Sequence, residues 1–162
     1  MSFINRPKGF LLHLLSIVGI FIFSLSDWIR VSWGFGDGFR FSLFNVWGKL
    51  EDSALEWLFQ YANEYEIMKT VMLILVITMI LSFVLLIFSL IEYNSKKSIV
   101  LAYIGFGLSA LVPVIFMISI ISLNRDIEGS FLTISPLLSF IIAITGMFFI
   151  KKTHQLGDNP VL

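Results

Sequence analysis

Few residues in this sequence could carry out chemistry, and they lie far apart. The 162 residues include two histidines and eleven carboxylates, and no cysteine. Metal and haem sites need several ligands in one place, and thiol catalysis needs cysteine. Because His13 and His154 stand near opposite ends of the chain, we predict no metal and no cofactor. We expect His13 to lie at a membrane interface or to hydrogen-bond to a neighbouring helix.

Catalysis by a serine nucleophile or by a phosphate-binding loop is not indicated either. No glycine-rich loop follows a strand-like segment in the pattern that cradles phosphates. A Ser/His/Asp triad needs its three groups together, and here the histidines and most carboxylates are predicted on opposite sides of a membrane. The formal net charge is zero, without a basic tract that would attract nucleic acid. The sequence therefore predicts a protein that is not an enzyme and does not bind nucleic acid.

Long apolar segments dominate the chain and predict a membrane protein surrounded by lipid. Hydrophobic residues make up 57% of the sequence and charged residues only 14%, whereas soluble domains are about 25% charged. A membrane-spanning helix needs roughly 20 mainly apolar residues. Four segments meet this requirement, at residues 9–26, 70–91, 99–123 and 131–150. We predict one domain, residues 1–162, folded as an all-α bundle of four transmembrane helices.

The basic residues predict which side of the membrane each loop faces. Six of them lie in short segments beside the predicted spans, in the two tails and between the second and third spans: Arg6, Lys8, Lys96, Lys97, Lys151 and Lys152. Nine of the eleven carboxylates fall in the other two loops. Because short basic segments stay in the cytoplasm, we predict a multi-pass protein of the cell membrane with both termini cytoplasmic. The first span also resembles a signal peptide, but we expect it to be retained.

The first outer loop, residues 27–66, is long enough to fold as a small outer subdomain. Apolar and polar residues alternate over residues 29–35 and again over 39–43, which is typical of half-buried strands. The glycine-rich residues 34–38 between them predict a turn. The alternation changes phase at Phe44, which predicts a bulge or a strand end there. We therefore expect an extracellular β-hairpin.

A hairpin alone is marginally stable in water, so a short helix is expected to support it. Ser53 and Glu56 form a capping-box pattern, and the apolar residues that follow have helical spacing. This helix should run on into the second span. The second outer loop, residues 124–130, is predicted to be a tight connector that contributes little to the subdomain.

All four tryptophans lie in the first outer loop. Trp28 and Trp57 stand near the span ends, where an aromatic belt at the membrane interface is expected. Trp33 and Trp47 lie inside the predicted hairpin, where they are expected to pack the subdomain. The alternative is a surface for a partner protein, since aromatic residues dominate interface hot spots. The residues of that predicted partner interface are Trp28, Trp33, Phe44, Trp47 and Trp57.

Inside the predicted spans, small residues and a proline point to helix packing. Gly105 and Ser109 stand four residues apart in the third span, and small residues let helices approach closely in lipid. The contact could lie within the bundle or between copies. Pro113 predicts a kink that leaves a carbonyl near Ser109 without its usual donor. Interrupted helices also occur at transport sites, which is the alternative for Pro113.

Five short segments around the first, second and fourth spans form a recognisable pattern. They are Ser26-Asp27-Trp28-Ile29-Arg30, Ser42-Leu43-Phe44, Trp47, Lys69 and Glu128-Gly-Ser-Phe-Leu132. This pattern resembles the claudin and peripheral-myelin-protein-22 superfamily, whose members have four spans, cytoplasmic termini and a long first outer loop that forms a small sheet. In that family the loop carries a Trp, a Gly-Leu-Trp and two cysteines. Trp28 matches the first Trp and Ser42-Leu43-Phe44 stands for Gly-Leu-Trp, but the cysteine pair is missing. The resemblance therefore implies the fold without the disulfide and without a junction-forming function.

These features together predict a non-enzymatic integral membrane protein. Its expected role is that of a scaffold, assembly or accessory subunit, which contacts other membrane protein subunits or a second copy through the aromatic outer loop. The alternative is a small channel or transporter subunit, because the outer carboxylates would concentrate cations. A lipid-handling role is a further possibility, but nothing in the sequence beyond the apolar bundle indicates it specifically.

Overall fold

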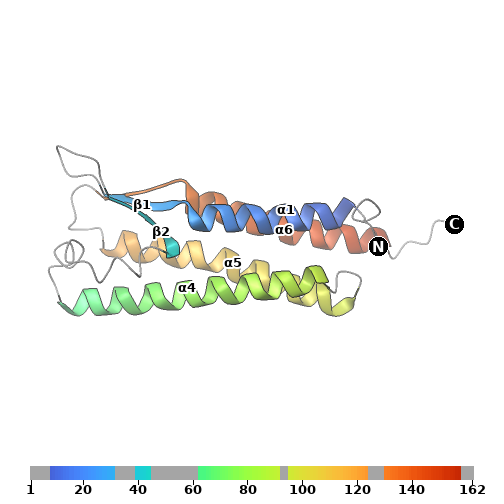
Figure 1. The fold of residues 1–162 in the computed structure, drawn as a ribbon, viewed down its shortest axis with the longest axis horizontal. Coiled ribbons are helices and arrows are strands. Elements are labelled where there is room, and N and C mark those ends of the chain that lie inside the picture. Colours follow the sequence, from blue (N-terminus) through green and yellow to red (C-terminus); the bar gives the residue numbers. More distant parts are fainter. Residues whose placement is uncertain (1–7, 32–38, 45–61, 92–94, 124–129, 158–162) are drawn as a thin grey trace.

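The computed structural model describes residues 8–31, 39–44, 62–91, 95–123 and 130–157. In these parts of the chain, long helices form an elongated bundle with a small sheet at one end (Figure 1). The helices are α1 (Lys8–Leu25), α4 (Ala62–Ile91), α5 (Lys96–Leu123) and α6 (Ser135–Gly157). The strands are β1 (Asp27–Val31), β2 (Phe39–Ser42) and β3 (Ser130–Leu132). A fold of four helices is therefore confirmed.

The four helices are apolar over different lengths. The segments Lys69–Ile91 of α4 and Lys96–Ser122 of α5 are long and apolar enough to cross a membrane. The apolar segments of α1 and α6 are shorter, Gly9–Leu25 and Ser135–Ile150. The surface of the bundle is apolar as well, with large exposed side chains on every helix: Leu15, Ile74, Ile118 and Phe148, among others. A water-soluble bundle would place polar residues on this surface.

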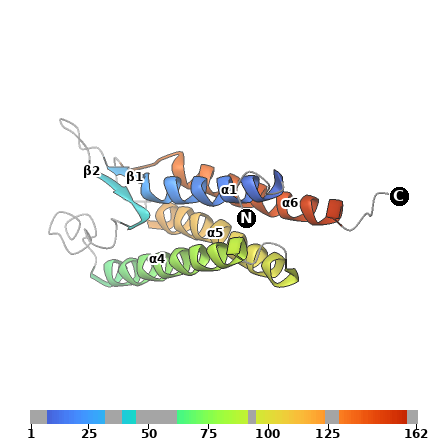
Figure 2. The same cartoon turned by 45° about the vertical axis from the view of Figure 1, so that its right-hand side comes forward.

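Successive helices run in opposite directions along the bundle, as the colour gradient in Figure 1 shows. Helix α5 packs along both α4 and α6, and α6 packs along α1, whereas α1 and α4 touch over a smaller area. The start of α1 and the end of α6 consequently lie at the same end of the bundle (Figure 2). The sheet lies at the opposite end of the bundle.

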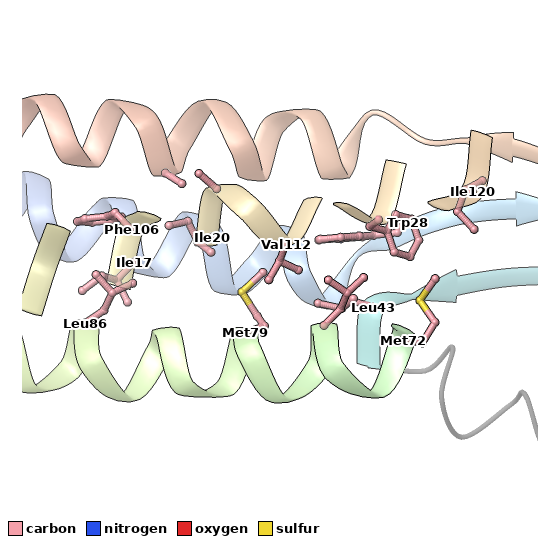
Figure 3. Packing of buried hydrophobic residues seen from close by; sticks show 14 of the residues in the cluster. Ile17, Ile20, Trp28, Leu43, Met72, Met79, Leu86, Phe106, Val112 and Ile120 are labelled. Carbon is pink, nitrogen blue, oxygen red and sulfur yellow. The ribbon is translucent and has the colours of Figure 1, made fainter. Parts of the chain in front are cut away.

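A row of buried side chains fills the centre of the bundle from the middle of the helices to the sheet (Figure 3). Phe106 and Phe116 of α5 are completely buried, as are Ile20 of α1, Met79 of α4 and Ala143 of α6. Because all four helices contribute to this row, a change in the volume of one side chain disturbs the packing of its neighbours on the other helices.

The sheet has the strand order β2-β1-β3, and both pairs of neighbours are antiparallel. The pairing of β1 with β2 sets Arg30 opposite Arg40, and the pairing with β3 sets Arg30 opposite Phe131. The residues that join β1 to β2, including the predicted turn at 34–38, lie outside the described residues, and so do Ser53 and Glu56. The short helix of the first outer loop was predicted to run on into the second span. The structure describes this continuation from Ala62, where α4 begins.

Strand β3 corrects two predictions about the region before the fourth helix. The fourth span was expected to begin at Phe131, and the loop before it was expected to contribute little. Instead, Ser130–Leu132 form a strand against β1, and α6 begins only at Ser135. Hydropathy alone cannot separate a short apolar strand from the start of a helix. Pro136 then lies in the first turn of α6, where its missing N–H costs nothing.

The irregularity in the sheet lies at Trp28, in β1. Asp27 pairs with Ser42 and Ile29 pairs with Phe41, so Trp28 is an extra residue between them. Such a bulge lets two consecutive side chains face the same side, and both Trp28 and Ile29 are buried. At Phe44, where a bulge or a strand end was predicted, β2 has already ended at Ser42.

Candidate functional site

The sheet is held at one end of the bundle by the contact between the sheet and the helices around Trp28, here called the sheet–bundle junction. Trp28 has no exposed surface. Its indole Nε1–H donates a hydrogen bond to the carbonyl of Phe23, in the last turns of α1, at 2.6 Å. Its ring meets the ring of Phe116 edge to face, with centroids 4.8 Å apart and planes at 86°. Edge-to-face pairs are favourable because the positive ring edge meets the negative ring face.

Thr133 joins β1 to the beginning of α6 at this junction. Its N–H donates to the carbonyl of Trp28 at 3.0 Å, and its hydroxyl donates to the carbonyl of Asp27 in a short hydrogen bond. The same hydroxyl oxygen accepts a bond from the N–H of Ser135 at 3.4 Å. One side chain therefore satisfies backbone groups of a strand and of a helix start, where unpaired groups would be costly.

The end of β2 completes the junction. Leu43 is fully buried and Ser42 is nearly so, whereas Phe44 is half-buried and packs against the core. In Figure 3, Leu43 lies between Trp28 and the α4 helix, which carries Met72 and Met79. The sheet thus rests on apolar side chains of the bundle.

The structure places two of the five predicted interface residues inside this junction. Trp28 was expected in a membrane-interface belt or on a partner surface, and burial corrects both expectations: the bulge turns its ring into the bundle. Phe44 keeps only part of its surface free. Trp33, Trp47 and Trp57 lie outside the described residues. Extended back from residues 29–35, the alternation would place Trp28 on the face of Arg30, and the bulge is what turns its ring to the buried face.

The predicted packing residues of α5 lie against α4. The Ser82 hydroxyl of α4 donates to the carbonyl of Gly105 at 2.9 Å and shares a short hydrogen bond with the Ser109 hydroxyl. A side chain at Gly105 would place its Cβ 2.7 Å from the Leu86 Cγ. The two helices therefore approach closely here, within one chain. Pro113 is buried in α5, which continues past it to Leu123.

A second buried polar contact links α1, α4 and α5 near the other end of the bundle. His13 is 2% exposed, and its Nε2 lies 3.0 Å from the Ser89 hydroxyl. Since that hydroxyl donates to the carbonyl of Leu86, the His13 Nε2–H is the donor to Ser89. Ser98 of α5 donates to the Ser89 carbonyl at 2.6 Å. The expectation that His13 bonds to a neighbouring helix agrees with this geometry.

A third close contact, between α5 and α6, involves residues that the sequence reasoning did not name. A Cβ at Gly146 would lie 2.6 Å from the ring of Phe106. The same Phe106 ring packs on His13, with ring centroids 5.3 Å apart. Gly146 is a small residue in an apolar run, which is a signal for close packing, but the sequence does not identify its partner.

These contacts hold helices and strands together, and their chemistry is that of packing. Among the described residues, no three histidine or carboxylate side chains come close enough to bind a metal ion. The buried polar groups are mainly serine hydroxyls that bond to carbonyls, such as Ser16 to Leu12 and Ser24 to Ile20. Ser139 is buried without a hydrogen-bond partner. The described arrangement can hold the sheet in a fixed position at one end of the bundle.

No family model matches this chain, and no curated protein sequence matches it closely enough to show a relationship.

Proposed function

We propose that the protein is a four-pass integral membrane protein that acts, without catalysis, as a scaffold, assembly or accessory subunit through its outer segment. Membrane placement is supported by the outward-facing apolar side chains on all four helices. Further support comes from the buried serines and His13, whose hydrogen bonds lie inside the bundle. In lipid, polar groups have to find partners within the protein.

The proposed orientation places the sheet outside the cell and both termini in the cytoplasm. Lys96 and Lys97, at the start of α5, stand at the end of the bundle opposite the sheet. Basic residues beside span ends favour the cytoplasmic side. The resemblance to the claudin and peripheral-myelin-protein-22 superfamily supports the same orientation, and we propose a claudin-like architecture without the disulfide.

The observation that carries the assembly role is the rigid junction beneath the outer segment. Trp28, Leu43 and Thr133 fix all three strands to the helices. The chain between β2 and α4 holds two of the four tryptophans, Trp47 and Trp57. A rigid base reduces the entropy cost of presenting such residues to a partner. The interior of the described bundle is filled by Phe106 and Phe116, which favours assembly over the channel or transporter role.

The assembly role predicts that the native protein is part of a complex that depends on the outer tryptophans. In a mild detergent, native mass spectrometry of the purified protein should give a mass above that of one 18.5 kDa chain. Replacing Trp33, Trp47 and Trp57 together by serine should leave a single chain, because aromatic anchors supply much of an interface's energy. The same three positions changed to phenylalanine serve as the matched control and should keep most of the complex. A single chain in the unsubstituted protein, extracted in the same detergent from its native membrane with its partners present, would refute the assembly role.

A further inference from the structure

Ser139 of α6 differs from the other buried serines of the described helices in how its hydroxyl is placed. It has no exposed surface, and no described protein group bonds to its hydroxyl. Ser16, by contrast, bonds to the Leu12 carbonyl of its own helix. Ser98 bonds to the Ser89 carbonyl of a neighbouring helix. A buried hydroxyl without a protein partner costs free energy unless a bound water or ion pairs with it.

Pro113 of α5 leaves a second buried polar group without its usual partner. In an α-helix, each carbonyl accepts a hydrogen bond from the N–H four residues later. Proline has no N–H, so the Ser109 carbonyl lacks this donor. Ser109 has no exposed surface and Pro113 is buried as well. In membrane helices, carbonyls freed by proline are satisfied by neighbouring helices, by serine or threonine side chains or by ordered waters.

The packing of α5 against α6 brings these two groups to one level of the bundle. The two helices are antiparallel (Figure 1), and Gly146 of α6 lies against the Phe106 ring of α5. Seven residues make nearly two helical turns and so return to the same face. Seven residues from this contact toward the sheet, α5 has Pro113 and α6 has Ser139. These two residues therefore lie within about one turn of the same level, on the faces that meet at Gly146.

We propose that one bound water joins α5 to α6 at the proline. It accepts a hydrogen bond from the Ser139 hydroxyl and donates one to the Ser109 carbonyl, so that both buried groups gain a partner. Buried waters in proteins make about two to four hydrogen bonds to groups that would otherwise be unsatisfied. Helix α6 thus supplies the donor that proline removes from α5. The site goes beyond the assembly role and does not depend on it, because it rests on the packing of α5 and α6 alone.

Two substitutions and their combination test whether Ser139 serves the Ser109 carbonyl. Ser139→Ala removes the donor that holds the water and leaves the carbonyl unpaired. The equilibrium constant of unfolding, measured by SDS titration in mild detergent, should therefore rise about fivefold, as for the loss of one hydrogen bond. Pro113→Ala gives the carbonyl a helical N–H donor again. In that background, Ser139→Ala should change the constant by less than about twofold.

Ser16→Ala is the matched control, because Ser16 is also buried and its hydroxyl bonds within its own helix. Its effect should be the same with proline or alanine at position 113. A stabilising or neutral effect of Ser139→Ala in the unsubstituted background would mean that the hydroxyl has no partner. Equal losses from Ser139→Ala in both backgrounds would mean that it bonds elsewhere. Either result would overturn the proposal.

A crystal structure grown from a lipidic mesophase, at a resolution that shows ordered water, tests the water itself. We expect density for one water about 2.5–3.2 Å from both the Ser139 Oγ and the Ser109 carbonyl oxygen, and none at this place in Ser139→Ala. A direct hydrogen bond between these two protein atoms would overturn the water site. So would a Ser139 hydroxyl that donates to the Ser135 carbonyl of its own helix.

Discussion

Replacing Trp28 by alanine should lower the free energy of unfolding by about 3–5 kcal/mol, the usual cost of removing a large buried aromatic side chain. Trp28 is completely buried, bonds through its indole N–H to the Phe23 carbonyl, and packs edge to face on Phe116. The substitution removes all three contributions and leaves a cavity beneath the sheet. Unfolding of the purified protein in mild detergent, followed by circular dichroism during heating or SDS titration, measures the loss.

The variant Trp28→Phe separates the ring from its hydrogen bond. Phenylalanine keeps an aromatic contact with Phe116 and loses the donor to the Phe23 carbonyl, so the expected cost is about 1–3 kcal/mol, the range for an unsatisfied buried group. A loss below about 1 kcal/mol in Trp28→Ala would mean that Trp28 does not support the junction. If Trp28→Ala weakened partner binding and left the free energy of unfolding unchanged, Trp28 would instead be an interface residue, as the sequence predicted.

Replacing Gly146 by alanine should destabilise the protein by about 1–3 kcal/mol, as overpacking of a core does. The added Cβ would lie 2.6 Å from two atoms of the Phe106 ring and 2.9 Å from a third. Phe106 cannot move aside easily, because it is fully buried and its ring also contacts His13. Helices α5 and α6 would therefore have to separate. The same unfolding measurement applies.

Gly107 of α5 offers the matched control for this substitution. A Cβ there meets only the terminal methyl of Met147, at 3.3 Å, and methionine adapts readily. Because alanine favours a helix over glycine by about 0.8–1.0 kcal/mol, Gly107→Ala should be neutral or slightly stabilising. Equal effects of Gly146→Ala and Gly107→Ala would argue against a close contact between α5 and α6 at Gly146.

The helices of this chain follow from simple properties of its sequence. Long apolar runs, interrupted by charged or glycine-rich segments, predict the four helices, and the end of α4 at Ile91 and of α5 at Leu123 are as predicted. The predicted apolar spans are shorter than two of the helices, because α4 begins at Ala62 and α6 continues to Gly157. The pairing of β1 with β2 agrees with the alternation on either side of the glycine-rich segment. In these elements, local pattern and tertiary packing favour the same structure.

The features that the sequence did not indicate depend on contacts between distant segments. Strand β3 is three residues long, and its pairing with β1 is the only feature that distinguishes Phe131 and Leu132 from a helix start. The burial of Trp28 depends on a bulge defined by its partner strand. The partner of Gly146 is forty residues away, in α5. Single-sequence periodicity carries no information about such partners.

Labelling of single cysteines in intact cells tests the proposed topology most directly. In that topology the sheet faces the cell exterior and the start of α5 faces the cytoplasm. Arg30 in β1 and Lys97 in α5 are both exposed, at opposite ends of the bundle (Figure 1), and the chain has no other cysteine. A membrane-impermeant maleimide should react with Arg30→Cys in intact cells and with Lys97→Cys only after the membrane has been permeabilised. Reaction of Lys97→Cys in intact cells, or protection of Arg30→Cys until permeabilisation, would contradict the proposed topology.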